Sequence, residues 1–108
     1  MGDLDKPTLY TWITAPRGLL PQWTADACGF EILVLPIDTA AMRSEDYKQV
    51  HANGKCPALV IDTGIVVEST SIIRYMARAT GKLYGSGAFE GGQVEQWLQF
   101  YQEDLAPL

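Results

Sequence analysis

The amino-acid sequence predicts a single α/β domain in which a mixed four-stranded sheet carries helices on both faces. A strand, helix, strand order occupies residues 8–36, and two short apolar runs flank the turn residues Asp62, Thr63 and Gly64. Apolar residues then recur at helical spacing after residue 69. With 108 residues, of which 47% are hydrophobic, the chain can bury one core.

The first third of the chain predicts a strand, a helix and a second strand. Residues 8–13 are rich in β-branched and aromatic side chains, which favours a strand at the centre of the sheet. A turn at residues 14–18 precedes a helix that ends near Gly29. Because Gly18 and Pro21 are poor residues for its start, the regular helix is expected to begin only around Leu20. Residues 31–35 are almost continuously apolar, as in a strand covered on both faces, and Pro36 is expected to end this strand.

The middle of the chain predicts a helix, a hairpin and a further helix. Ser44 can cap a helix from Glu45 to about His51. Residues 58–61 and 65–67 form the hairpin strands, and Ser69 stands where the N-cap of the next helix is expected. The resulting order, βαβ-α-ββα, is the thioredoxin-like arrangement.

The C-terminal segment differs in composition from the rest. Residues 85–92 are rich in glycine and are expected to form a linker. An amphipathic helix is predicted beyond it, because apolar residues recur there at helical spacing. These apolar residues are Val94, Trp97, Leu98, Tyr101 and Leu105. The expected organisation is a domain over residues 1–84, a linker over 85–92, and the first helix of a truncated helical domain over 93–108.

Two features of the hairpin and its following helix point to a ligand edge. The N-terminus of a helix carries partial positive charge, so Ser69 lies beside a site for a carboxylate, while Glu68 can accept an ammonium group. Pro57 cannot donate to the sheet ladder and leaves the backbone of Cys56 free to pair with an extended peptide. The same strand, turn, strand and capped helix also occur in folds that bind no ligand, so a purely structural interpretation stands beside this one.

The segment Gly54-Lys55-Cys56-Pro57-Ala58-Leu59, followed by Glu68-Ser69-x-x-Ile72-x-x-Tyr75, resembles the N-terminal domain of glutathione transferases. The resemblance implies a cis proline, backbone pairing of the preceding residue with the cysteinyl part of glutathione, and a Glu-Ser pair that holds the γ-glutamyl end. The implied glutathione-binding residues are Lys55, Cys56, Pro57, Glu68 and Ser69. His51 and Ala52 depart from the family's Asn-Pro pair in the loop before this segment.

The two ends of the chain resemble a narrower group. Thr8-Leu9-Tyr10-Thr11, and Gln93-Val94-x-Gln96-Trp97-x-x-Phe100, are similar to the gamma subunit of translation elongation factor 1 and to related domains appended to aminoacyl-tRNA synthetases. In these relatives the domain mainly serves assembly. The resemblance therefore implies a protein–protein assembly module of the translation machinery, with translation proteins or synthetases as partners. A glutathione-binding transferase or reductase domain is the alternative.

Catalysis in the transferases uses a hydroxyl or thiol just after the first strand, which hydrogen-bonds the glutathione sulfur and lowers its pKa. Tyr10, Thr11 and Thr14 are the candidates here. Thr14 fits the geometry best, because Tyr10 and Thr11 lie within the strand, and Arg17 can stabilise a thiolate. Both Thr14 and Arg17 also suit ordinary loop roles. The sequence leaves open whether the protein is a glutathione transferase, and absence of activity is favoured because the second domain that usually holds the electrophile in the transferases is expected to be missing.

The predicted last helix is expected to have an uncovered apolar face. In the transferase family such a helix opens a second, all-helical domain, and the sequence looks like the N-terminal half alone. Val94, Trp97, Leu98, Tyr101 and Leu105 then have one domain instead of two to cover them. We expect self-association through this helix or its docking on another chain.

Several classes of function are excluded or disfavoured by composition. A net charge of −5 without a Lys/Arg cluster disfavours direct binding to nucleic acid. No apolar stretch is long enough to span a bilayer, and the first six residues lack the core of a signal peptide, so a cytoplasmic protein is expected. Cys28 and Cys56 do not form a Cys-x-x-Cys pair, and no group has metal-ligand spacing. No metal and no required cofactor are expected. Cys56 is interpreted as a small apolar residue, and His51 as a residue favoured by a helix C-terminus.

Overall fold

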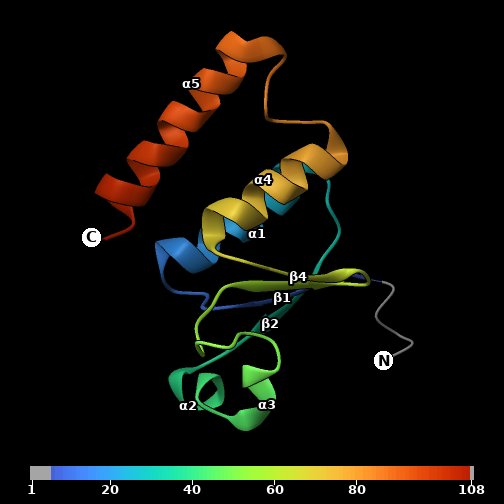
Figure 1. The fold of residues 1–108 in the computed structure, drawn as a ribbon, viewed down its shortest axis with the longest axis vertical. Coiled ribbons are helices and arrows are strands. Elements are labelled where there is room, and N and C mark those ends of the chain that lie inside the picture. Colours follow the sequence, from blue (N-terminus) through green and yellow to red (C-terminus); the bar gives the residue numbers. More distant parts are fainter. Residues whose placement is uncertain (1–5, 108) are drawn as a thin grey trace.

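A computed structural model describes residues 6–107 as a sheet with two long helices on one face and a further long helix beyond them (Figure 1). The elements in order are β1 (Thr8–Thr11), α1 (Pro16–Cys28), β2 (Leu33–Pro36), α2 (Thr39–Met42), α3 (Glu45–Lys48), β3 (Ala58–Ile61), β4 (Gly64–Val67), α4 (Ser69–Thr80) and α5 (Gly87–Phe100). A π-helical turn, Tyr101–Leu105, continues α5.

The sheet has the topology that the sequence predicts. The strand order is β2-β1-β3-β4. Strand β1 pairs in parallel with β2 and antiparallel with β3, and β3 and β4 form an antiparallel hairpin. The thioredoxin-like fold, with β1 at the centre of a mixed four-stranded sheet, is therefore confirmed.

The main core lies between the sheet and the helices α1 and α4. Leu9 and Leu59, which are paired in register on β1 and β3, are fully buried there. They pack with residues from both helices, among them Cys28, Ile72 and Met76. Since α4 spaces its apolar residues along one face, it covers the sheet with that face and leaves its polar side outward.

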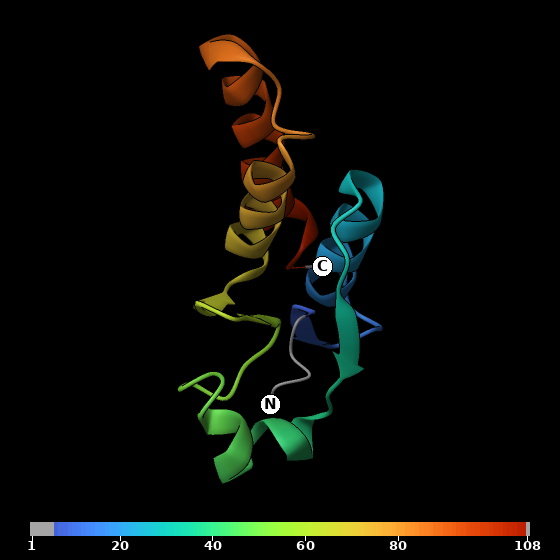
Figure 2. The same cartoon turned by 90° about the vertical axis from the view of Figure 1, so that its right-hand side faces the viewer.

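The opposite face of the sheet is covered only at one end. The short helices α2 and α3 lie there, and Ile37, Met42 and Tyr47 form a second, small cluster against Tyr10 (Figures 1 and 2). The expectation that the second strand is covered on both faces was wrong. β2 is an edge strand, and Leu33 and Leu35 remain 46% and 37% exposed.

The boundaries of three helices differ from the sequence predictions. Helix α1 begins at Pro16 instead of around Leu20, because a proline in the first helical turn has no N–H to leave unpaired, and Pro21 is accommodated within the helix. Helix α3 ends at Lys48 instead of His51. The expected N-cap of α4, Ser69, is the first helical residue, and Glu68 occupies the cap position.

Helix α5 begins inside the segment expected to be a linker. Its first residue is Gly87, and it includes the pair Gly91 and Gly92, so the glycine content did not prevent a helix. The carboxylate of Glu90 accepts hydrogen bonds from the backbone N–H and the hydroxyl of Ser86, which stabilises the first turn. In Figure 1, α5 lies on the side of α4 that faces away from the sheet. No helix within residues 6–107 is long and apolar enough to cross a membrane.

Candidate functional site

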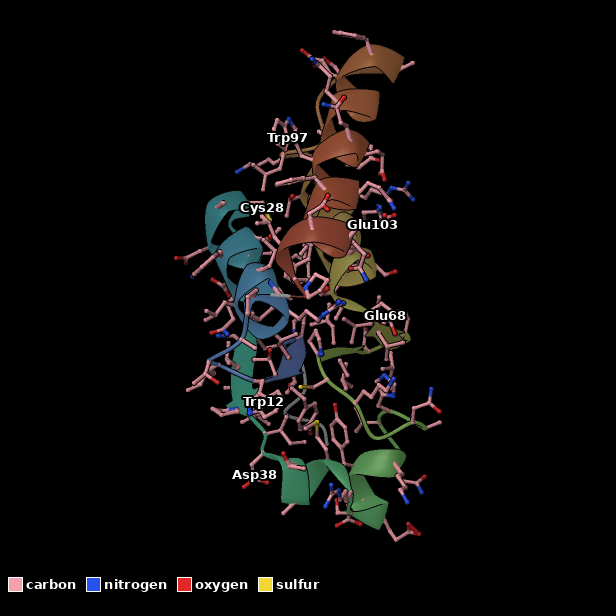
Figure 3. The ribbon with its side chains drawn as sticks, turned by 90° about the vertical axis from the view of Figure 1, so that its left-hand side faces the viewer. Trp12, Cys28, Asp38, Glu68, Trp97 and Glu103 are labelled. Carbon is pink, nitrogen blue, oxygen red and sulfur yellow. The ribbon has the colours of Figure 1, made fainter. Side chains whose placement is uncertain are left out.

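A cavity of about 320 Å³ opens where the loop before β3 meets the start of α4. Its lining residues are Arg17, His51, Lys55, Cys56, Pro57, Glu68 and Ser69. The five residues that the sequence resemblance assigned to glutathione binding thus lie together, with Arg17 beside them. Figure 3 shows Glu68 at the junction between the sheet and the helices, far from Trp97 on α5.

The backbone on both sides of the cavity has unusual conformations. The peptide bond between Cys56 and Pro57 is cis. Glu68 has φ 76° and ψ 127°, a region that residues other than glycine rarely adopt. Such strain persists only where the surrounding structure enforces it, and it is concentrated at functional sites. The conformation of Glu68 therefore marks this cavity as a candidate binding site.

The loop before β3 is held by Tyr47 of helix α3. The Tyr47 hydroxyl donates a hydrogen bond of 2.6 Å to the carbonyl of Lys55. Burial raises the pKa of Tyr47 to about 12, so the phenol keeps its proton and remains a donor. Gly54 has φ 63°, and a Cβ there would lie 2.8 Å from the carbonyl oxygen of Met42. These contacts fix the backbone that leads into the cavity.

The Cys56 side chain belongs to the small second cluster. It packs against the group formed by Ile37, Met42 and Tyr47. Burial raises the pKa of the Cys56 thiol, and a hydrogen bond with the backbone of Trp12 offsets this only in part. A thiol with a raised pKa is protonated at neutral pH, which makes it a poor nucleophile. The interpretation of Cys56 as a small apolar side chain agrees with this environment.

His51 lines the cavity although the sequence interpretation gave it no ligand role. That interpretation relied on a helix C-terminus, but α3 ends three residues earlier, at Lys48. The residue is only 7% exposed, and its Nδ1 accepts a hydrogen bond of 3.2 Å from the backbone N–H of Asn53. The signal that could have found it is its position in the loop that enters the predicted binding segment.

The two residues predicted for catalysis occupy different places. Arg17, at the start of α1, lines the cavity. Thr14 is exposed in the loop after β1 and is not among the lining residues. Thr11, the alternative hydroxyl, is fully buried and donates to the carbonyl of Gly18 at 2.8 Å. Thr11 is thereby engaged in holding the end of β1 to the start of α1.

A second cavity, of about 460 Å³, lies between α1, α4 and α5. All five residues of the predicted interface line it: Val94, Trp97, Leu98, Tyr101 and Leu105. Trp97 is 64% exposed and Leu105 is 45% exposed, while the Tyr101 hydroxyl is buried without a hydrogen-bond partner among residues 6–107. We call these five residues the α5 face. The same described part of the chain contains no cluster of side chains suited to a metal ion.

Comparison with known proteins agrees with this geometry. Residues 6–78 match the family model described as "Glutathione S-transferase, N-terminal domain". Over 82 residues the chain is 33% identical to glutathione S-transferase GST-4.5 of Xanthomonas campestris. The aligned segment covers 72% of this chain and 39% of the relative. It is 42% identical over 55 residues to elongation factor 1-gamma of Trypanosoma cruzi, covering 48% of this chain and 13% of that protein.

Solved structures with the same fold include proteins bound to glutathione. A glutathione transferase family member from Pseudomonas fluorescens with two bound glutathiones superposes with a TM-score of 0.84 at 21% identity, covering 95% of this chain and 48% of that one. Ure2p in complex with glutathione superposes with a TM-score of 0.81 at 24% identity, covering 96% and 52%. This chain spans 39% and 13% of the two curated relatives' lengths. The chain belongs to the glutathione S-transferase N-terminal domain family.

Proposed function

We propose that the cavity at the start of α4 binds glutathione. The observation that carries this proposal is the meeting of Glu68 and Ser69 with the backbone of Cys56 and Pro57 around one cavity of about 320 Å³. Glutathione is an extended peptide with two carboxylates and one ammonium group. The residues that line the cavity include the acidic Glu68 and the basic Arg17 and Lys55.

The proposed roles follow from the chemistry of each wall. The Glu68 carboxylate binds the ammonium of the γ-glutamyl residue, and the N-terminus of α4 at Ser69 binds its carboxylate. The backbone of Cys56 pairs with the cysteinyl residue of the peptide, because Pro57 contributes no N–H of its own. Of the two residues predicted for transfer chemistry, Arg17 lines the cavity and is proposed to lie near the sulfur, whereas Thr14 lies outside the lining. Both the Cys56 thiol and the Tyr47 phenol have raised pKa values, which makes them unsuitable as bases at neutral pH.

Calorimetric titration with reduced glutathione tests the binding. Wild type should bind, and Glu68→Ala should weaken the affinity about tenfold or more, because a hydrogen bond to a charged group is lost. Glu31→Ala, which removes an exposed carboxylate outside the cavity, is the matched control and should bind as wild type. Equal affinity of the two variants would contradict the role of Glu68, and no binding by wild type would contradict the proposal itself.

A second candidate function is assembly with translation proteins, and the α5 face favours it. An exposed tryptophan beside an apolar cavity is typical of a protein-interaction surface. The chain is also similar to proteins named elongation factor 1-gamma, and this similarity supports an assembly role with translation proteins. We propose that the α5 face binds a translation factor or synthetase, or a second copy of this chain, in the cytoplasm. Light scattering at increasing protein concentration, followed by titration with purified elongation factor subunits, tests this role.

A further inference from the structure

Strand β2 ends the sheet on one side and leaves part of its backbone without a neighbouring strand. The strand order β2-β1-β3-β4 places it at an edge, and Figure 2 shows it in teal at the border of the sheet. We propose that this edge binds an extended basic segment of a partner protein, which adds to the sheet as a further strand. The site shares no lining residue with the glutathione cavity and does not depend on it.

The hydrogen bonds of β2 show which of its backbone groups face outward. In a parallel pair, alternate residues of a strand direct their N–H and carbonyl groups to the neighbouring strand. The N–H of Leu33 donates to the carbonyl of Pro7 at 2.8 Å. The N–H of Ile37 donates to the carbonyl of Thr11 at 3.0 Å. Val34 has the opposite parity, so its N–H and carbonyl point away from β1 and are available to an added strand.

A cavity of about 650 Å³ lies alongside this edge. Val34 lines it together with Trp23 and Asp26 of α1. Val34 is in register with Leu9, and residues in register point to the same face of a sheet. That face is the one covered by α1, because Leu9 belongs to the main core. A peptide residue opposite Val34 therefore directs its side chain to the same face, into the cavity.

The side chains around the cavity favour an arginine at this position. Trp23 is 62% exposed, so the face of its indole is accessible to a ligand. The charged lining residues are Asp26, Glu31 and Lys6, all of them exposed, so carboxylates outnumber ammonium groups. A guanidinium can stack on an indole and form paired hydrogen bonds with a carboxylate. The charge and the exposed aromatic ring are thus complementary to arginine.

The other face of β2 favours apolar residues on both sides of that arginine. Leu33 and Leu35 alternate with Val34 and so point away from the cavity, where they are 46% and 37% exposed. Natural edge strands often carry charged residues that prevent pairing with other chains, but β2 has none and is blunted only by Pro36 at its end. The expected partner segment is an extended apolar-Arg-apolar sequence that pairs antiparallel to β2.

The probe is the acetylated and amidated pentapeptide Thr-Val-Arg-Val-Thr, titrated into the protein by calorimetry up to millimolar concentration. Wild type should bind it, and Trp23→Ala should weaken the affinity about tenfold, because the contact between guanidinium and indole is lost. Phe89→Ala is the matched control and should bind as wild type, since Phe89 is 78% exposed on α5 and outside this cavity. Equal losses in the two variants, or no binding by folded wild type, would overturn the proposal.

A peptide variant tests the backbone pairing without changing the protein. The same peptide with an N-methylated arginine cannot donate to the Val34 carbonyl and should bind about tenfold more weakly or worse. If both peptides bind equally, the peptide does not extend the sheet and the proposal is wrong. The glutathione titration is independent of this result, so failure here leaves the proposed function in place.

Hydrogen exchange of the Val34 amide locates the added strand. In the free protein this amide should exchange faster than that of Leu33, which is bonded to Pro7. Saturating peptide should slow the exchange at Val34 and leave the rate at Leu33 unchanged. A Val34 amide that stays unprotected would overturn the proposal. Protection without peptide that grows with protein concentration would identify a second copy of this chain as the occupant, and would overturn it as well.

Discussion

Arg74 on α4 donates two hydrogen bonds to the carboxylate of Glu95 on α5, at 3.0 and 2.6 Å. Glu95 also accepts a hydrogen bond from the Tyr84 hydroxyl, and the Arg78 guanidinium lies 5.7 Å from the centre of the Tyr84 ring. Helix α5 has no buried residue, although Leu98 packs against the main core. The ion pair is thus a principal contact that fixes the direction of α5 and shapes the α5 face.

This ion pair predicts a pH dependence for the attachment of α5. Hydrogen bonds from Arg74 and Tyr84 lower the pKa of Glu95 to about 2 from its ordinary value of 4.5. Since the pKa is lower in the folded state, the stabilisation is complete above pH 4.5 and is lost as the pH falls towards 2. Because both side chains are partly exposed, the contribution is about 0.5–1 kcal/mol.

The measurement is the free energy of unfolding as a function of pH for wild type, Glu95→Gln and Asp104→Asn. Glu95→Gln should be less stable at pH 7 and should lose the dependence that belongs to this group below pH 4.5. Asp104 is an exposed carboxylate in the segment after α5, and its replacement should leave that dependence intact. Identical pH profiles for the two variants would argue against a stabilising ion pair.

Gly18 is predicted to tolerate no side chain. A Cβ on Gly18 would lie 1.6 Å from the carbonyl oxygen of Trp12 and 2.9 Å from the hydroxyl oxygen of Thr11, and a backbone oxygen cannot move aside cheaply. Gly18→Ala should therefore reduce the free energy of unfolding by at least about 3 kcal/mol. Gly92 in α5 has no atom near the position of a Cβ, so Gly92→Ala should stabilise the protein by about 0.5–1 kcal/mol. Chemical denaturation of both variants provides the comparison.

The fold could be predicted because local patterns and topology agreed. The β-branched run at residues 8–11 and the apolar run at residues 58–61 form neighbouring strands, and the Asp62–Gly64 turn joins the hairpin as expected. The exposure of Leu33 and Leu35 could not be predicted in this way, because the residue pattern of an apolar strand does not show whether the strand lies at the edge or at the centre of a sheet. Whether β2 is covered depends on where the short helices α2 and α3 pack, and this is a tertiary property.

The candidate site could be predicted in part. Glu68, Ser69 and the Cys56-Pro57 pair were identified from a sequence motif, and they meet at one cavity. His51 was not expected to line the cavity, because its position depends on the end of α3 and on the amide of Asn53, which no periodicity encodes. The start of α5 was missed for a related reason. Gly87, Gly91 and Gly92 have low helix propensity, but the Ser86–Glu90 hydrogen bonds and the contacts of α5 with α4 override it.

Tyr47 is predicted to support ligand binding from outside the cavity. Tyr47→Phe removes the 2.6 Å hydrogen bond to the carbonyl of Lys55 while it keeps the aromatic ring against Tyr10. We expect a loss of about 1 kcal/mol in stability and a several-fold loss in glutathione affinity, because the loop before β3 is less firmly held. Denaturation and calorimetry measure the two effects. Unchanged affinity in a destabilised variant would limit Tyr47 to a role in folding.

The α5 face is predicted to cause self-association. Trp97→Ser combined with Leu105→Ser should weaken a dimer about tenfold or more, since exposed aromatic residues dominate such contacts. Phe89→Ser is the matched control, because Phe89 is 78% exposed on the same helix but does not line the α5 cavity. Sedimentation equilibrium distinguishes the variants. A wild-type protein that stays monomeric at high concentration would rule out self-association through this face.

The central claim is that the cavity bordered by Glu68 and Cys56 binds glutathione. The most direct measurement is a ¹H–¹⁵N spectrum recorded during titration with reduced glutathione up to millimolar concentration. The amide resonances of Cys56, Glu68 and Ser69 should shift together with one dissociation constant, while the indole resonance of Trp97 stays in place. Unchanged resonances at these three residues, or equal shifts spread over the whole chain, would contradict the claim.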